Sequence, residues 1–226
     1  MSLILHYHPL SSFCMKVMIA LYERESSFEG RIVNLGDAES SARLLACWPL
    51  AKIPVLEDTD RGLVLPETSI IIEHVDRVSP GPARLIPADP GRALQVRLWD
   101  RVFDLYVNVH MGKIVTDRFR PEGCSDPQGV EDAMTAIGNA YNVIEHQLRD
   151  EGWIAGDTFT MADCAAAPAL FYANTIIPLS AKHPKSHTYL ERLLQRPSVA
   201  RVIDDARPFF KFYPLKERLP EQYRTA

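Results

Sequence analysis

The sequence predicts a chain of two unlike halves, an α+β half followed by a half built only from helices. Up to residue 80, short apolar runs alternate with helical patterns in the order β-α-β-α-β-β-α. The stretch 79–90 contains four prolines, which remove backbone donors and fix φ, so we expect an irregular connector there. After it only helical spacing continues. Strands in one half and helices alone in the next are typical of two different layer types.

Each element of the first half has its own local signal. The run 3–7 is apolar and ends at Pro9, as expected for a buried strand. Apolar residues at helical spacing follow over 13–21, and a serine at position 11 or 12 can cap this helix. The polar residues 58–61 separate a pair of short apolar runs and predict a hairpin. The expected strands are 3–7, 28–35, 53–56 and 62–65, and the expected helices are 13–21, 40–47 and 68–78.

The second half shows helical spacing throughout. The expected helices are 93–115, 130–148, 161–174, 188–194 and 199–206. Thr160 and Asp163 have the spacing of a capping box, in which the hydroxyl accepts from the third helical N–H and the carboxylate reaches back. We therefore expect Asp163→Ala to destabilise the protein by about 1–2 kcal/mol.

Composition and charge exclude several classes of protein. Of 226 residues, 46% are apolar and 24% charged, and the net charge of −4 gives no reason to expect nucleic acid or an anionic membrane as partner. No secretory signal or membrane-spanning run is expected. The cysteines at 14, 47, 124 and 164 are scattered without metal-ligand spacing, so we expect reduced thiols, no metal and a cytoplasmic location.

Two short segments carry the chemistry. Proline cannot sit in a central strand, so Pro54 must begin a strand or lie at an edge. A cis Ile53–Pro54 bond would turn the backbone of Ile53 outward, where a short peptide could pair with it. Glu67 and Thr68 stand at a helix start, where Thr68 can cap and the N–H groups can hold a carboxylate. A carboxylate beside that site suits a ligand with both an α-amino and an α-carboxyl group.

The runs KIPVLED (52–58) and LPETSIIIEHVD (65–76) closely resemble the N-terminal domain of glutathione transferases. The resemblance covers nearly the whole chain and implies a thioredoxin-like N-terminal domain over 1–79. It further implies a linker over 80–89 and an all-helical domain over 90–226 that forms the electrophile pocket. The Thr160–Asp163 pattern resembles the N-capping box of a buried helix in that second domain.

The resemblance also implies glutathione as the co-substrate. Ile53 and Pro54 would present backbone groups to its cysteinyl residue, and Lys52 would approach its glycine carboxylate. Glu67 and Thr68 would take its γ-glutamyl group. The family more often has Ser at the position of Thr68. It also more often has Asn-Pro-x-Gly where this chain has Trp-Pro-Leu-Ala (48–51).

The residue that activates the glutathione thiol is expected at the turn before the first helix. In serine-type members, by resemblance, the hydroxyl at the position of Ser11 points at the sulfur. A donor and a helix N-terminus both favour the thiolate, which ordinarily forms near pH 8.5. Three alternatives stay open: Ser12, Tyr7 as in tyrosine-type members, and Cys14, which would suggest thiol exchange but more simply fills the core.

The long helix after the connector is expected to line the electrophile pocket. Its candidates are Phe103, Tyr106 and His110, with Val107 and Met111 on the same face and with Phe171 and Tyr172 from a later helix. Ordinary packing is the alternative for each of them.

The predicted function is conjugation of glutathione to a small hydrophobic electrophile, as in detoxification, by a homodimer. The alternatives are a glutathione-dependent isomerase of the maleylacetoacetate type and a non-catalytic binding or regulatory module with the same fold.

Overall fold

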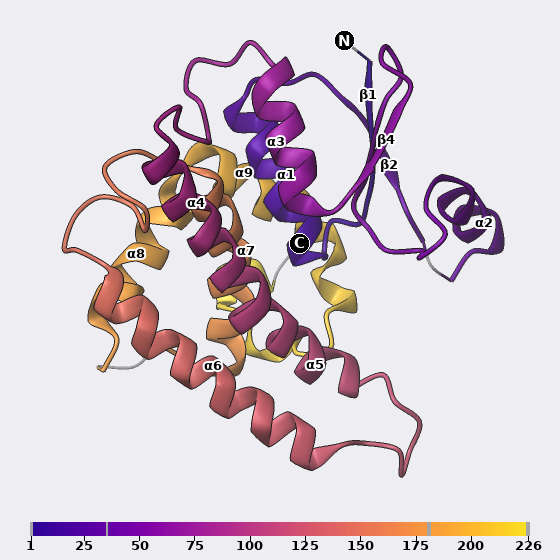
Figure 1. The fold of residues 1–226 in the computed structure, drawn as a ribbon. Coiled ribbons are helices and arrows are strands. Elements are labelled where there is room, and N and C mark those ends of the chain that lie inside the picture. Colours follow the sequence, from indigo (N-terminus) through magenta and orange to yellow (C-terminus); the bar gives the residue numbers. More distant parts are fainter. Residues whose placement is uncertain (1, 35, 180–181, 225–226) are drawn as a thin grey trace.

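The computed structural model describes residues 2–34, 36–179 and 182–224. Its first half is a mixed sheet of strand order β2-β1-β3-β4, in which β1 and β2 are parallel and β3 runs antiparallel to β1 and β4. Helices α1 and α3 cover one face and α2 lies on the other side (Figure 1). The elements are β1 (Leu3–Tyr7), α1 (Ser12–Glu23), β2 (Glu29–Ile32), α2 (Ala38–Cys47), β3 (Val55–Asp58), β4 (Leu63–Pro66) and α3 (Thr68–Val78). This is the predicted order.

Three strands differ from their predicted bounds. The strand expected over 62–65 is β4, Leu63–Pro66, shifted by one residue. The strand expected over 28–35 is only β2, Glu29–Ile32, and Leu35 lies outside the described residues. The strand expected from 53 begins at Val55, because Pro54 has no N–H to donate to the sheet.

The second half is helical. It contains α4 (Pro90–Val102), a π-helical segment η1 (Phe103–Asn108), α5 (Val109–Asp117), α6 (Pro127–Gln147), α7 (Met161–Ile176), α8 (Pro184–Gln195) and α9 (Pro197–Ala206). Helix α7 lies in the middle, in contact with α1 and α4, and is buried over almost its whole length (Figure 1). The 3-10 turns η2 (Arg207–Phe212), η3 (Lys216–Arg218) and η4 (Glu221–Tyr223) complete the described chain.

One hydrophobic core joins the two halves. Leu5 and Met18 of the first half belong to the same buried cluster as Phe103 and Ala166 of the second. Residues 79–89 between the halves form a coil. The buried guanidinium of Arg24 holds this coil by donating to the carbonyls of residues 79, 81 and 83. The sheet and the helices therefore have a fixed relative position.

The start of α7 is closed by the predicted capping box. An Asp163 carboxylate oxygen accepts from the backbone N–H and the hydroxyl of Thr160, at 2.8 and 2.9 Å. Its other oxygen accepts from the N–H of Ile154 and from the hydroxyl of Tyr189. Burial raises the pKa of Asp163 to about 6, although these four donors oppose the shift.

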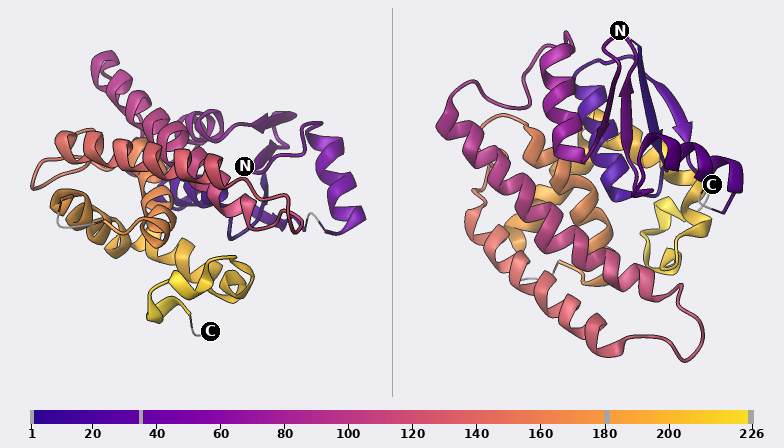
Figure 2. Two further views of the ribbon diagram at one scale, coloured as in Figure 1. Left: turned by 90° about the horizontal axis from the view of Figure 1, so that it is seen from below. Right: turned by 45° about the vertical axis from the view of Figure 1, so that its right-hand side comes forward.

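The C-terminal turns fold back toward the first half (Figure 2). The rings of His8 and Phe209 lie 5.4 Å apart, and the hydroxyl of Tyr22 donates to Asp205. This return places η2 and the residues after it beside the start of α1. Among the described residues, the helices are too short or too polar to cross a membrane.

Candidate functional site

The five residues predicted to bind glutathione line one cavity. This first cavity has a volume of about 290 Å³ and lies between the sheet edge, α3 and the long helix α4–η1–α5. Its walls include Lys52, Ile53, Pro54, Glu67 and Thr68. The other lining residues are Phe13, Trp48, Pro66, Arg101, Asp104, Leu105 and Val109. Segments 52–54 and 67–68 therefore meet in space.

The backbone before β3 is placed as the cis-proline hypothesis requires. The Ile53–Pro54 peptide bond is cis. The hydrogen-bonded register of β3 begins at Val55, so the N–H and C=O of Ile53 lie outside the strand ladder. They are left at the wall of the first cavity, where an extended peptide could pair with them.

The start of α3 opens onto the same cavity. Thr68 was expected to cap this helix, and that expectation is wrong: Glu67 holds the N-cap position with a φ of 70°, and no side chain in the described chain caps it. The uncapped N–H groups of the first turn and the positive end of the helix dipole are features that favour an anion. Ala51, beside Lys52, also has a positive φ of 50°. Such conformations are unfavourable outside glycine and concentrate at binding sites.

A second cavity, of about 300 Å³, adjoins the first across Phe13, which lines both. Ser11 and Ser12 lie in its wall at the start of α1. The remaining walls are mostly apolar and come from η1, α5, α7 and the C-terminal return. They are Leu10, Asn108, Met111, Gly112, Val115, Thr116, Phe119, Tyr172, Phe212, Tyr213 and Pro214.

The four candidates for thiol activation near the start of α1 differ in burial and in whether they line a cavity. Ser11 is the N-cap, and its oxygen accepts from the N–H of Cys14 at 3.3 Å, which leaves its own hydrogen available to donate. Ser12, in the same wall, is almost buried. Cys14 is fully buried, and burial raises the pKa of its thiol to about 12. Tyr7 lines neither cavity, and burial likewise raises its pKa. The geometry leaves the two serines as candidates.

Known proteins match both halves of this chain. Residues 5–83 match the family model for the glutathione S-transferase N-terminal domain, and residues 105–197 match the model for its C-terminal domain. The chain belongs to the glutathione S-transferase family. The family and the fold class predicted from the sequence are confirmed.

The similarity to individual relatives extends over nearly the whole length of this transferase. A glutathione S-transferase of Pseudomonas putida is 28% identical over 89% of this chain and 91% of its own length. The structure of a glutathione S-transferase from Methylobacillus flagellatus with glutathione bound superimposes with a TM-score of 0.81, at 26% identity, over 88% of this chain and 98% of that one. A second structure, from Methylobacterium radiotolerans in complex with glutathione sulfonate, gives 0.76 at 27% identity, over 89% and 94%.

Sequence reasoning missed a buried charged cluster behind the first cavity of this transferase. Lys16, which is 0% exposed, places its ammonium 2.6 Å from Asp100 and 2.7 Å from Asp104. Arg101 contacts both carboxylates from the cavity side. One oxygen of Asp104 is buried with no hydrogen-bond partner among the described residues. Burial raises the pKa of Asp104, against the opposing effect of Lys16.

The only sequence signal for this cluster is the position of Lys16. It stands within an otherwise apolar helical run, where a charged residue must find partners when it is buried. Those partners lie 84 and 88 positions away in the chain, too far for spacing to identify them.

The residues predicted to line an electrophile pocket lie in different surroundings in the structure. Phe103 is fully buried in the core, Tyr106 is 58% exposed, and neither they nor His110 line the second cavity. Met111 and Tyr172 do line it, whereas Phe171 and Val107 are packed in the core. The expected face assumed a regular α-helix. The wide π-helical turn at Phe103–Asn108 changes the angle between successive residues. Residues placed on one face by α-helical spacing therefore point in different directions.

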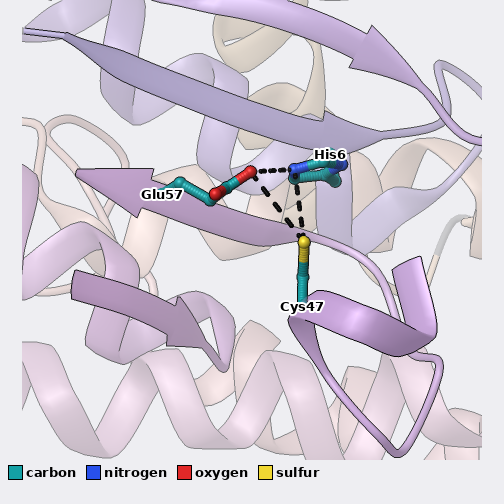
Figure 3. Close-up of side chains that lie close together, drawn as sticks. All are labelled: His6, Cys47 and Glu57. Carbon is teal, nitrogen blue, oxygen red and sulfur yellow. Dashed lines mark hydrogen bonds and ion pairs between the residues drawn. The ribbon is translucent and has the colours of Figure 1, made fainter. Parts of the chain in front are cut away.

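A separate cluster of potential metal ligands lies on the other face of the sheet. Figure 3 shows His6 and Glu57 in contact, with the sulfur of Cys47 beside both. The ring of His6 is 2.5 Å from the carboxylate of Glu57, and the guanidinium of Arg31 is 3.8 Å from the same oxygen. Burial, chiefly, raises the pKa of the Cys47 thiol. The positive guanidinium repels a cation here. The three residues form a hydrogen-bonded cluster between the sheet and the end of α2.

Proposed function

We propose that this protein conjugates glutathione to a small electrophile, with glutathione in the first cavity and the electrophile in the second. One observation supports this above the others. The cis-proline loop and the uncapped start of α3 line one cavity, and the start of α1 lines the cavity beside it. A thiol held by the first pair of features would meet the serines at the start of α1.

The first cavity offers a complementary group for each end of glutathione. We assign the cysteinyl backbone to Ile53 and the glycine carboxylate to Lys52. The γ-glutamyl carboxylate is assigned to the first turn of α3 and to Thr68. Each pairing is a charge-assisted or backbone hydrogen bond of the kind that gives orientation as well as affinity.

The α-ammonium of the γ-glutamyl group is assigned to Glu67 and to the unpartnered oxygen of Asp104. Lys52, a third positive side chain at this cavity, is assigned to the glycine carboxylate. The other five charged side chains are Lys16 and Arg101, which are positive, and Glu67, Asp100 and Asp104, which are negative. These five leave one negative charge over. A ligand ammonium would balance it, and a buried charge is stable only when it is paired.

Ser11 is assigned the thiol. Its oxygen already accepts from the backbone, so its hydrogen can be donated to sulfur, and the positive end of α1 adds to the stabilisation of a thiolate. The thiol proton is lost to solvent. The thiolate then forms a carbon–sulfur bond with the electrophile, which expels a leaving group or takes up a proton. Ser12 is the second candidate for this role.

Two further assignments accompany this function. We propose a homodimer, supported by exposed apolar side chains on adjoining helices, Ile70 of α3 with Leu94 and Leu98 of α4. Equilibrium sedimentation tests it, and a monomer at micromolar concentration would contradict it. We also propose a cytoplasmic role in detoxification, where reduced glutathione is available and where the four free cysteines stay reduced.

Isothermal titration with glutathione tests the central proposal. We expect binding with a dissociation constant at or below the millimolar range, and about tenfold or more weaker binding for Glu67→Gln, which removes one charge without changing shape. Glu151→Gln, at an exposed position in the 148–160 segment, is the matched control. No binding heat with the wild-type protein at millimolar glutathione would contradict the proposal.

A further inference from the structure

A third cavity, of about 330 Å³, lies between the sheet and α2. Helix α2 stands on the side of the sheet opposite to α1 and α3 (Figure 1). The described residues that line this third cavity are His6, Arg31, Ile32, Val33, Ser40 and Arg43. None of them lines the first or the second cavity. The third cavity is therefore separate from the site assigned to glutathione and the electrophile.

The wall of the third cavity is positively charged. Arg31 comes from β2 and Arg43 from α2, so two different elements bring like charges to one cavity. No acidic side chain among the described residues lines it. Two guanidinium groups in one wall repel each other unless an anion lies between them. The charge of the wall therefore favours an anionic ligand.

The carboxylates that pair with these two arginines lie at the protein surface. The Nε of Arg31 is 2.7 Å from Glu29, and the Nη1 of Arg43 is 3.4 Å from Glu39. The side chains of Glu29 and Glu39 are 60% and 79% exposed. Exposed ion pairs contribute only about 0–1 kcal/mol, and a guanidinium has five N–H donors. Each arginine can therefore donate to a ligand at little cost.

Two further polar side chains have fixed positions in this wall. The hydroxyl oxygen of Ser40 accepts from the backbone N–H of Asn34 at 3.0 Å. His6 is almost buried, and its Nε2 contacts the carboxylate of Glu57. The first turn of α2 is already capped by Asp37, which accepts from the N–H of Ser40. An anion in the third cavity would therefore be bound by side chains and not by the helix start.

We propose that the third cavity binds the phosphate group of a small phosphate ester. A phosphate monoester carries about two negative charges and three free oxygens, so it can accept from two guanidinium groups at once. A single carboxylate has one charge and two oxygens, which one guanidinium already satisfies. Ile32 and Val33 offer apolar surface to the rest of the ester, and the volume leaves room for it.

This inference does not rest on the proposed function, because no residue of the third cavity is assigned to glutathione or to the electrophile. Ribose 5-phosphate is the first probe, titrated calorimetrically into the protein with glutathione present at saturation. We expect a dissociation constant below the millimolar range. We expect Arg31→Gln and Arg43→Gln each to weaken binding about tenfold or more, since each loses a charge-assisted hydrogen bond.

Arg149→Gln is the matched control. Arg149 is an exposed arginine that pairs with an exposed carboxylate, as Arg31 and Arg43 do, but it lines none of the three cavities. We expect its affinity for ribose 5-phosphate to stay within about twofold of the wild-type value. An equal loss in this control, or no binding heat from the wild-type protein at millimolar ribose 5-phosphate, would overturn the inference.

Two other anions test the chemistry of the ligand. Inorganic phosphate should bind about tenfold more weakly than ribose 5-phosphate, because it makes no use of the apolar surface. Equal affinity would contradict an ester and make free phosphate the ligand. Succinate carries two negative charges on separate carboxylates, and we expect it to bind more weakly than either phosphate. Tighter binding of succinate would overturn the proposal of a phosphate group.

Backbone amide chemical shifts locate the bound ester and separate this inference from the proposed function. We expect ribose 5-phosphate to change the shifts of residues 31–33 and 40–43, with or without glutathione. Changes confined to residues 52–54 and 67–68 would place the ester in the first cavity and would overturn the inference. Absence of glutathione binding would contradict only the proposed function.

Discussion

Helices α3 and α7 begin in opposite ways. At the start of α7, the Asp163 carboxylate accepts from two backbone N–H groups and two hydroxyls, and the whole assembly is buried. At the start of α3, no described side chain caps the helix, and Thr68 faces a cavity. Both starts carry the same unpaired N–H groups and the same dipole.

The difference is what satisfies those groups. At the start of α7 the acceptors come from the chain itself: the carbonyl of Leu85 accepts from the N–H of Met161, and the Thr160 side chain accepts from the N–H of Asp163. The start of α3 has no side-chain cap among the described residues, so a carboxylate of a ligand can take that place. A helix start therefore stabilises the fold when groups of the chain itself accept from its N–H groups. It can bind a ligand when the chain provides no such acceptor.

The α7 start gives the largest expected effect. Asp163→Ala leaves two buried backbone N–H groups and two hydroxyls without their acceptor, and we expect a loss of about 3–5 kcal/mol in unfolding free energy. This exceeds the sequence-based figure, because Ile154 and Tyr189 could not be seen to share the carboxylate. Urea unfolding measures it. The control is Asp157→Ala, whose 84% exposed side chain pairs with Arg149 at the surface. A loss there equal to that of Asp163→Ala would refute the comparison.

The same carboxylate should make stability depend on pH. Its pKa is about 6 in the folded state, against 3.8 for a free aspartate. Between these values the folded protein binds more protons than the unfolded chain. The contribution of this carboxyl group to the unfolding free energy is therefore largest below pH 4 and falls as the pH rises through 6. Asp163→Asn removes the titration. Relative to that variant, the wild-type protein should lose about 2–3 kcal/mol of unfolding free energy between pH 4 and pH 6, because one pKa unit corresponds to about 1.4 kcal/mol. A difference that stays constant or grows with pH in urea titrations would contradict this.

The start of α1 is the intermediate case, because Ser11 caps it and still has a hydrogen to donate. We expect Ser11→Ala to lower kcat/KM for conjugation by about 10- to 100-fold, since the thiolate loses a donor. The loss of the cap should cost about 1 kcal/mol of stability. Ultraviolet titration of bound glutathione measures its thiol pKa, which should rise in the variant. Ser12→Ala is the control, and a larger effect there would transfer the role to Ser12.

The α3 start gives the smallest expected effect, because most of its anion site is backbone. Thr68→Val keeps the shape and removes the hydroxyl, and we expect glutathione affinity to fall about three- to tenfold by isothermal titration. Unfolding free energy should stay within about 0.5 kcal/mol, since Thr68 caps nothing. Thr188→Val, on the exposed side of α8, should change neither quantity. A marked loss of stability without loss of affinity would make this helix start structural, like that of α7.

Local signals in the sequence predicted the order of the helices and strands, one helix cap and the meeting of two binding segments. The element order of both halves followed from apolar spacing and from proline, and α3 occupies the predicted residues 68–78. The capping box at Thr160 and Asp163 is a pattern of four adjacent positions, which makes it visible without a structure. Segments 52–54 and 67–68 could be expected to meet because a short hairpin joins them and holds them in one sheet.

Only the tertiary structure decided what surrounds those segments. Lys16 meets Asp100 and Asp104 across the two halves, and Asn108 meets the same cavity as Tyr172 although 64 positions separate them in the chain. The π-helical turn changed which residues of the long helix face that cavity. Periodicity reports which side of an element is buried, because burial follows from spacing along one helix or strand. It carries no information on which distant side chains share that interior, since their meeting depends on how whole elements pack.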